Sequence, residues 1–463
     1  MKDLNAPTDS GSAETWTSDF LSELETAERE FVVHGPTYHT IHRLAAGIRC
    51  LGRSEMGNPP LLCLCTENKT CLAAAFLAAL SGGPRLVLPY AFSRQAVEEV
   101  LKTVTVSTIL ADHPGDLPEK SQVILPFMLK EKAPASFHNG IDADEPFLML
   151  FTGGSTGTPK VWAKTARNMI AEARYMIARF GITAEDIFLS TVPPQHIYGL
   201  LFSVLIPLIA SARILDGIYV FPREIMKIAR EAKASVLVSV PACYRVLKGN
   251  FLKQHHLRLA FSSAGALDPG DADYFRENAG LDVNEIYGST ETGGVATRRR
   301  GTDGDAWHGL DPVQWRIIDG RLQVQSPFIS PSLPRNAEGF FVTADRAVKD
   351  GPGCFVLKGR ADDVVKIGGK RVDLAEIREK MMKIIGVQDA LLVQIPIGQG
   401  RPADLAALVV TENDPGTLRQ KMTALVEPYA IPRRFVKVDK IPVTPTGKYD
   451  RAEIQRILDA APL

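Results

Sequence analysis

Short apolar runs alternate with amphipathic segments between residues 61 and 215 and again between residues 222 and 261, and this alternation constrains the fold more than any other feature of this sequence. The runs with strand length are residues 61–65, 85–88, 108–110, 236–240 and 258–261. The segments with helical length and spacing are residues 70–80, 93–103 and 222–232. Strands that alternate with helices predict parallel or mixed sheets covered by helices, so the fold class is α/β.

The chain length of 463 residues predicts at least two domains, and an apolar fraction of 45% is enough to fill their cores. After Trp307 the sequence pattern changes from alternating strands and helices to short strands joined by turns, which predicts a small antiparallel, barrel-like unit. From residue 361 onward about a hundred residues, including an expected helix at 374–385, are enough for a separate α+β domain. We therefore expect an N-terminal domain at 1–360 and a C-terminal domain at 361–463.

Charge and hydropathy narrow the class of partner. The chain has 53 basic and 53 acidic residues, which gives no electrostatic reason to expect nucleic acid or an anionic membrane. The apolar runs at 71–80 and 199–210 are about half the length needed to cross a bilayer. The first twenty residues lack the basic start and apolar centre of a secretory signal. We expect a cytoplasmic protein whose partner is a small molecule.

The cysteines agree with a reducing compartment. Six cysteines are few for this length, and a disulfide framework is not expected. Cys63, Cys65 and Cys71 could suggest a metal site, but the first two fall in an expected core strand and no second pair matches them. Buried thiols are the favoured interpretation.

A glycine- and hydroxyl-rich run follows the expected strand at 147–151. It consists of Thr152, Gly153, Gly154, Ser155, Thr156, Gly157, Thr158, Pro159 and Lys160. Glycines let the backbone approach a ligand closely, and hydroxyls and successive N–H groups can donate to an anionic oxygen, so a polyphosphate fits this loop. Thr158 and Pro159 separate the last glycine from Lys160, which excludes a Walker loop. Taken alone, the run could also be a flexible surface turn.

Three further motifs follow in a fixed order: residues 286–291 (Ile-Tyr-Gly-Ser-Thr-Glu), residues 358–372 around Gly-Arg-Ala-Asp-Asp, and residues 442–448 (Pro-Val-Thr-Pro-Thr-Gly-Lys). With the run at 152–160, this order resembles the adenylate-forming superfamily of acyl- and aryl-CoA synthetases, peptide-synthetase adenylation domains and beetle luciferases. The resemblance implies a large ATP- and acid-binding domain followed by a small rotating lid domain. It also implies two half-reactions: a carboxylate attacks Mg-ATP to give an acyl-adenylate and pyrophosphate, and a thiol then displaces AMP.

The resemblance assigns roles to residues of the large domain. The run at 152–160 would hold the β- and γ-phosphates, Thr290 would lie near the α-phosphate, and Glu291 would hold Mg²⁺, for which a carboxylate is suited. Gly288, Gly293 and Gly294 would shape the wall of the acid pocket, and Tyr287 would stack on adenine. The opposite wall would be formed by Ala264, Gly265 and Ala266, for which core packing is the alternative.

Further roles fall on later residues. Asp345 would bind both ribose hydroxyls, although Ala344 stands where the family usually has glycine, and Arg360 would contact ribose or phosphate. Lys448 would bridge the carboxylate and the α-phosphate, the alternative being a solvated charge. Asp362 would be the hinge of the lid. The residues that would border the thiol channel are Lys366, Gly368 and Gly369.

The identities of the acid and of the thiol acceptor stay open. His196 matches a family position that borders the acyl site, although a structural histidine is an equal alternative. Without a residue that clearly reads an α-amino group, a fatty or aromatic acid is favoured. The acceptor could be CoA or the phosphopantetheine arm of an acyl carrier protein. An amino-acid-activating or luciferase-like enzyme and a nucleotide-binding regulator that has lost catalysis are the rival functions.

Overall fold

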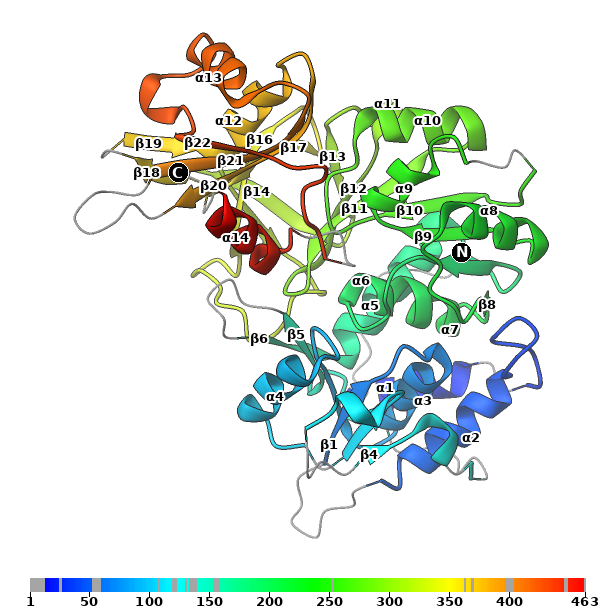
Figure 1. Ribbon diagram of the computed structural model, residues 1–463. Helices are drawn as coiled ribbons and strands as arrows, with labels where there is room; N and C mark the ends of the chain where they lie inside the picture. The colour runs from blue at the N-terminus through cyan, green and yellow to red at the C-terminus, as the bar shows by residue number, and fades with distance from the viewer. Residues whose placement is uncertain are drawn as a thin grey trace. The chain divides into compact units, whose positions relative to one another are not determined.

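A computed structural model describes most of the chain (Figure 1). The described residues are 13–24, 27–51, 60–106, 108–118, 123–129, 131–132, 140–152, 159–250, 254–361, 364–367, 370–395, 404–444 and 449–461. They form two compact units. The first comprises Met1–Gly304 and Ser326–Pro334, and the second comprises Asp305–Gln325 and Arg335–Leu463.

The first unit contains a six-stranded sheet in the order β4-β3-β1-β2-β5-β6. Its strands are β1 (Leu61–Cys65), β2 (Arg85–Leu88), β3 (Thr108–Ala111), β4 (Val123–Ile124), β5 (Pro146–Thr152) and β6 (Lys160–Thr165). Neighbouring strands are parallel except β5 and β6, which are antiparallel. The helices before and among these strands are α1 (Ala13–Glu23), α2 (Tyr38–Ile48), α3 (Lys69–Leu80) and α4 (Arg94–Thr103), with short turns η1 (Pro114–Asp116) and η2 (Pro126–Met128). Every residue of α3 is buried, which explains its continuous apolar sequence.

A second set of strands in the first unit has the order β12-β11-β10-β9-β7-β8. They are β7 (Ile187–Ser190), β8 (Arg213–Ile214), β9 (Val236–Ser239), β10 (Leu259–Ser262), β11 (Val283–Ser289) and β12 (Gly293–Arg299). All pairs are parallel except the β11–β12 hairpin. The accompanying helices are α5 (Ala166–Phe180), α6 (Ile197–Leu200), the π-helical η3 (Leu201–Leu205), α7 (Ile206–Ile209), α8 (Pro222–Glu231), α9 (Pro241–Leu247), α10 (Pro269–Ala279) and α11 (Arg300–Asp303).

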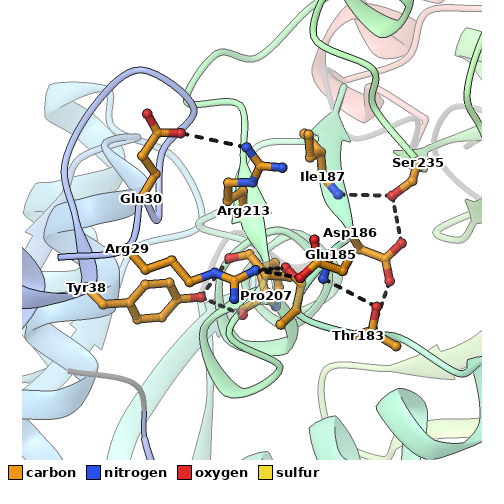
Figure 2. A network of polar contacts seen from close by, with 12 residues as sticks. Arg29, Glu30, Tyr38, Thr183, Glu185, Asp186, Ile187, Pro207, Arg213 and Ser235 are labelled. Carbon is orange, nitrogen blue, oxygen red and sulfur yellow. Dashed lines mark hydrogen bonds and ion pairs between the residues drawn. The ribbon is translucent and has the colours of Figure 1, made fainter. Parts of the chain in front are cut away.

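A polar network joins the start of α2 and the residues before it to the loops around this second set of strands (Figure 2). The Tyr38 hydroxyl donates to the carbonyl oxygens of Ala212 at 2.6 Å and Pro207 at 3.1 Å. The Asp186 carboxylate accepts hydrogen bonds from the Thr183 N–H at 2.8 Å and the Ser235 hydroxyl at 2.7 Å. The buried Tyr38 contacts tie the start of α2 to α7 and the segment between α7 and β8, and the Asp186 contacts tie the loop before β7 to the loop before β9.

Antiparallel strands open the second unit, in the order β14-β15-β16-β17-β13. Their bounds are β13 (Trp307–Gly309), β14 (Gln314–Ile318), β15 (Arg321–Gln325), β16 (Phe341–Lys349) and β17 (Cys354–Arg360). Asp319 and Gly320 make the turn between β14 and β15, both with positive φ, as a two-residue hairpin requires.

The rest of the second unit contains a two-stranded hairpin and a three-stranded sheet, together with helices. It comprises the hairpin β18 (Val364–Ile367) and β19 (Lys370–Asp373), the strands β20 (Val387–Ile395), β21 (Asp404–Thr411) and β22 (Arg434–Lys437), the helices α12 (Leu374–Met382), α13 (Pro415–Thr423) and α14 (Arg451–Ala460), and the turn η5 (Pro428–Ala430). Side chains of β21 alternate: Leu405 and Ala407 share a core with α12 and α13, whereas Ala406 and Leu408 share another with α14. The sheet is therefore buried on both faces.

The predicted α/β class is confirmed, and the antiparallel strands after Trp307 are present. The compact units divide the chain differently from a boundary at residue 360. Arg346 of β16 forms an ion pair with Asp373, and Ala375 of α12 packs directly against Gly359 of β17, so these strands group with the C-terminal residues. The functional division at residue 360 stays a prediction. No helix in the described ranges is long and apolar enough to cross a bilayer.

Candidate active site

The two ends of the phosphate-loop candidate are held next to each other. Thr152 ends β5, Lys160 begins β6, and the two residues are cross-strand partners. The Trp162 indole N–H donates to the Thr152 hydroxyl at 3.1 Å. Gly153, Gly154, Ser155, Thr156 and Gly157 lie outside the described residues. The loop therefore starts and ends on rigid strands at one edge of the sheet.

Thr290 and Glu291 lie at the tip of the β11–β12 hairpin, where Ser289 pairs with Gly293. The Thr292 hydroxyl is 2.9 Å from the Ser289 hydroxyl and 3.1 Å from the Ser289 N–H, which closes the turn. The backbone carbonyl of Glu291 accepts a hydrogen bond from the Ser330 N–H at 2.8 Å. These contacts fix the backbone of the turn, and both Thr290 and Glu291 keep part of their surface exposed.

The Glu291 carboxylate is the predicted cation ligand on this turn. It forms no hydrogen bond or ion pair with any residue in the described part of the chain. Mg²⁺ commonly binds to one or two carboxylates together with substrate phosphates and water, rather than to a complete protein cage. The described residues contain no cluster of three or more metal-ligating side chains. One unpaired carboxylate on a fixed turn therefore fits Mg²⁺ carried by ATP.

A buried lysine connects the strand that leaves the phosphate loop to the Glu291 turn. Lys164 of β6 is 1% exposed, and its ammonium group donates to the carbonyl oxygen of Phe328 at 2.9 Å and to that of Glu291 at 3.4 Å. Burial lowers the pKa of Lys164 to about 8, although the nearby carboxylates of Glu172 and Glu291 oppose this shift. The exit of the loop and the Glu291 turn are thus joined within one unit.

Glu172 of α5 completes this arrangement. Its carboxylate accepts a hydrogen bond from the Gly294 N–H at 2.7 Å. Burial raises the pKa of Glu172, and the charge of Lys164 and the Gly294 N–H act in the opposite direction. A Cβ atom at Gly293 would lie 2.6 Å from the Glu172 side-chain oxygen, so the turn sits directly on this carboxylate.

The proposed adenine-site walls come from adjacent parallel strands. Ala264, Gly265 and Ala266 follow β10 and are exposed, and Tyr287 lies in β11, the neighbour of β10. The Ser263 hydroxyl donates to the Ile286 carbonyl oxygen at 2.8 Å, which ties the turn to β11. Ala264 has a φ of +69°, a conformation that is uncommon for a residue with a Cβ and recurs at ligand sites. Gly288 is exposed beside Tyr287.

His196 immediately precedes α6, and its carbonyl oxygen accepts the Leu200 N–H at 2.8 Å. Next to it, the Gln195 side-chain oxygen and the Tyr198 hydroxyl are buried without a hydrogen-bond partner of normal geometry among the described residues. The ring centroids of Tyr198 and Phe202 are 5.1 Å apart with the rings tilted by 49°, and those of Phe202 and Phe261 are 5.0 Å apart. Aromatic rings and unsatisfied polar atoms thus occur together on the segment predicted to border the acid.

In the second unit, Asp345 and Arg360 are cross-strand partners on β16 and β17. The guanidinium and carboxylate are 3.8 Å apart, and the Asp345 N–H donates to the Thr343 hydroxyl at 3.1 Å. Ala344 is part of β16 and has no positive φ, so this position needs no glycine. The structure therefore brings the two predicted ribose-binding residues together.

The remaining predicted residues lie at or beyond the limits of description. Lys366 belongs to β18, but its side chain is outside the described residues, as are Gly368 and Gly369 between β18 and β19. Asp362 and Lys448 are also outside them. The loop that carries Lys448 is flanked by an antiparallel bridge between Val443 and Tyr449, so its two ends lie together.

Lys164 and Glu172 are the residues that sequence reasoning missed. A signal for Glu172 existed, because it falls among the buried positions Met169, Ala173 and Met176 on the inner face of α5. A charged residue on such a face needs a partner or a function. Lys164 carries a weaker signal, because β6 also begins with a lysine, Lys160, which is exposed, and only the last two residues of the strand are buried.

The chain belongs to the AMP-binding enzyme family, whose model matches residues 29–325, more than half of the sequence. Among curated proteins, p-hydroxybenzoic acid–AMP ligase FadD22 from Mycobacterium tuberculosis is 26% identical over 94% of this chain and 66% of its own length. Sulfoacetate–CoA ligase from Cupriavidus necator is 25% identical over 67% of each chain. The alignments span about two thirds of the length of these relatives.

Solved structures share the fold. ATP-bound MatB from Rhodopseudomonas palustris has a TM-score of 0.82 and 20% identity, covering 97% of this chain and 99% of its own. The o-succinylbenzoate CoA synthetase MenE from Bacillus subtilis, solved with its acyl-adenylate intermediate, has a TM-score of 0.79 and 18% identity over 96% of this chain and 98% of its own. At these identities the likeness shows the two-domain fold alone.

Proposed function

We propose that the chain activates a carboxylic acid with Mg-ATP, forming an acyl-adenylate and pyrophosphate, and then transfers the acyl group to a phosphopantetheine thiol of CoA or of an acyl carrier protein. The observation that carries this proposal is the connection through β6. This strand begins at Lys160, at the end of the phosphate-loop candidate, and reaches the Glu291 turn through Lys164. A polyphosphate held by the loop would thus lie on the same framework as a free carboxylate for its cation.

In the first half-reaction an anionic carboxylate must attack the anionic triphosphate of ATP. A carboxylate oxygen forms a bond to the α-phosphorus while the bond to the pyrophosphate oxygen breaks, and negative charge grows on the surrounding oxygens. Bound Mg²⁺ would neutralise part of that charge. Backbone N–H groups and hydroxyls of residues 152–157 would hold the leaving pyrophosphate, Thr290 would donate near the α-phosphate, and Lys448 would offset charge on the attacking side.

The substrate class follows from the segment around His196. The Gln195 side-chain oxygen is buried and has no hydrogen-bond partner among the described residues, and it lies on the segment that carries the Tyr198–Phe202 ring pair, which favours an aromatic acid with a hydrogen-bonding substituent. The likeness to a p-hydroxybenzoic acid–AMP ligase over 94% of the chain supports testing such acids first.

The test is a pyrophosphate-release screen with benzoate, p-hydroxybenzoate and fatty acids of several lengths. We expect p-hydroxybenzoate to give a kcat/KM about fivefold above that of benzoate, since one satisfied hydrogen bond contributes about 1 kcal/mol. Mass spectrometry with CoA and with a phosphopantetheinylated carrier protein then identifies the acceptor. If no acid of the panel stimulates pyrophosphate release, the assignment to acid activation is wrong.

A further inference from the structure

Two buried charges behind the Glu291 turn have no role in the reaction as described above. Lys164 is 1% exposed and Glu172 is 3% exposed, so neither side chain reaches solvent. Isolated buried charges are costly, and a strand and a helix could be filled here with apolar side chains instead. Their presence therefore calls for an explanation beyond packing.

Their contacts converge on one piece of backbone. The Lys164 ammonium group and the Ser330 N–H both donate to the Glu291 carbonyl oxygen, at 3.4 Å and 2.8 Å. Glu172 accepts the N–H of Gly294 on the other side of the turn, at 2.7 Å. The turn is thus held from β6 at its tip and from α5 at its return strand.

The strand β6 and the helix α5 also hold residues 327–330, the segment that supports the Glu291 turn. Lys164 donates to the Phe328 carbonyl oxygen at 2.9 Å, and the Asn168 side chain donates to the Pro327 carbonyl oxygen at 2.6 Å. Ser330, which donates to Glu291, comes two residues after Phe328. Two loops far apart in the sequence therefore meet at one ammonium group.

We infer that Lys164 and Glu172 are positioning residues that fix the Glu291 turn so that its carboxylate is set for the divalent cation bound with ATP. This inference rests on the proposed role of Glu291. Neither residue touches the reacting atoms. Both act through the backbone of the turn, as outer-shell partners do when they orient a metal ligand.

Lys164 affects cation binding in two opposite ways. The direction in which the Mg²⁺ requirement changes when Lys164 is replaced therefore shows which effect is larger. Positioning strengthens cation binding, whereas the ammonium charge repels a cation held by the adjacent carboxylate. Replacement by methionine removes both the hydrogen bonds and the charge at similar length. If positioning dominates, Lys164→Met weakens the response to Mg²⁺; if charge dominates, the response strengthens.

The experiment measures the free Mg²⁺ concentration that gives half-maximal acid-dependent adenylation. We expect Lys164→Met to raise it about tenfold or more while the KM for the acid changes little. Lys69→Met is the matched control, because Lys69 is equally buried and also donates to two carbonyl oxygens, those of Leu215 and Gly217, in another part of the first unit. An unchanged or lower Mg²⁺ requirement in Lys164→Met overturns the inference.

A second readout does not depend on activity. Amide hydrogen exchange should become faster in peptides covering residues 289–294 and 326–330 of Lys164→Met, and not in those of Lys69→Met. Should Lys164→Met fail to fold, Glu172→Gln keeps the shape and an acceptor for Gly294, and it should raise the Mg²⁺ requirement by a smaller factor. Unchanged hydrogen exchange in both segments overturns the positioning role, whether or not the native chain adenylates an acid. A native chain that adenylates no acid overturns the proposed function instead.

Discussion

Gly293 shows how closely single residues determine the candidate site. Its φ is +67°, and an added Cβ atom would lie 2.6 Å from the Glu172 side-chain oxygen and 2.7 Å from the Phe328 Cβ atom. The position therefore excludes other residues for two independent reasons, backbone conformation and lack of space. Both contacts belong to the framework that carries the Glu291 turn.

Replacement of Gly293 by alanine should cost more than backbone strain alone. We expect about 1–2 kcal/mol from the left-handed conformation and about 1–3 kcal/mol more from the overlap with Glu172 and Phe328. Urea unfolding measures the sum. Gly280→Ala is the matched control, because Gly280 has a φ of +69° and nothing within 4 Å of the added Cβ atom. Equal losses in the two variants would show that the predicted overlap is relieved at no cost.

The motif residues could be predicted from the sequence at this scale, whereas their supports could not. Glu291, Tyr287 and Asp345 fall in short patterns whose residue types match a known chemistry. Lys164 and Glu172 have no such pattern, because what defines them is a set of backbone carbonyl and N–H groups from distant segments. Only the folded chain brings these groups together.

Elements were predictable where one local rule determined them. The strand at residues 85–88 is found as predicted, since a short apolar run beside a buried helix has few alternatives. The helix predicted at 374–385 ends at Met382 instead. The N–H groups of Lys383 and Ile384 bond to carbonyl oxygens three residues back, and Gly386 follows with a φ of +91°. The apolar residues Ile384 and Ile385 continue the sequence pattern beyond Met382, where the helix ends.

The π-helical η3 shows a second limit of local rules. The apolar run at 199–210 indicates a buried segment, which the structure confirms for nearly all its residues. The change of helical type at Leu201–Leu205 is not marked in the composition. It lies between α6 and α7, where Pro207 lacks an N–H and the Ser203 hydroxyl donates to the Gly199 carbonyl oxygen at 2.7 Å.

The junction of β7, β9 and β10 gives a pH-dependent prediction at the scale of elements. Burial alone would raise the pKa of Asp186, but hydrogen bonds from Arg258, Thr183 and Ser235 outweigh it and lower the pKa below its usual value. A lowered pKa means that the folded state favours the carboxylate, so this stabilisation is present above the unfolded-state pKa of about 4 and is lost as pH falls through the folded-state pKa.

Asp186→Asn should therefore destabilise the chain by about 1–3 kcal/mol near neutral pH, because the Arg258 guanidinium loses its charged acceptor. The difference from the native chain should shrink as the pH falls below about 4. Urea midpoints measured across this range test it. Asp144→Asn, at an exposed ion pair with Arg167, should cost less than about 1 kcal/mol. A difference for Asp186→Asn that is constant with pH would contradict the argument.

At the scale of the whole molecule, the candidate residues are divided between the two compact units. The phosphate-loop ends, the Ala264 turn and Glu291 belong to the first unit, and Asp345, Arg360 and the loop of Lys448 belong to the second. The order of these motifs along the chain was enough to predict the family, which the match over residues 29–325 confirms. The acid and the acceptor were not predictable, because pocket shape depends on side chains that carry no motif.

The central claim is that a carboxylate oxygen of the substrate becomes bonded to the α-phosphorus of ATP. An acid labelled with heavy oxygen in its carboxylate tests this directly, by mass spectrometry of the products after transfer to a thiol. We predict that one heavy oxygen atom appears in AMP and none in inorganic phosphate, and that Lys448→Ala yields no labelled AMP. Heavy oxygen in inorganic phosphate together with ADP would contradict the account, because it would show that the acid attacks the γ-phosphorus.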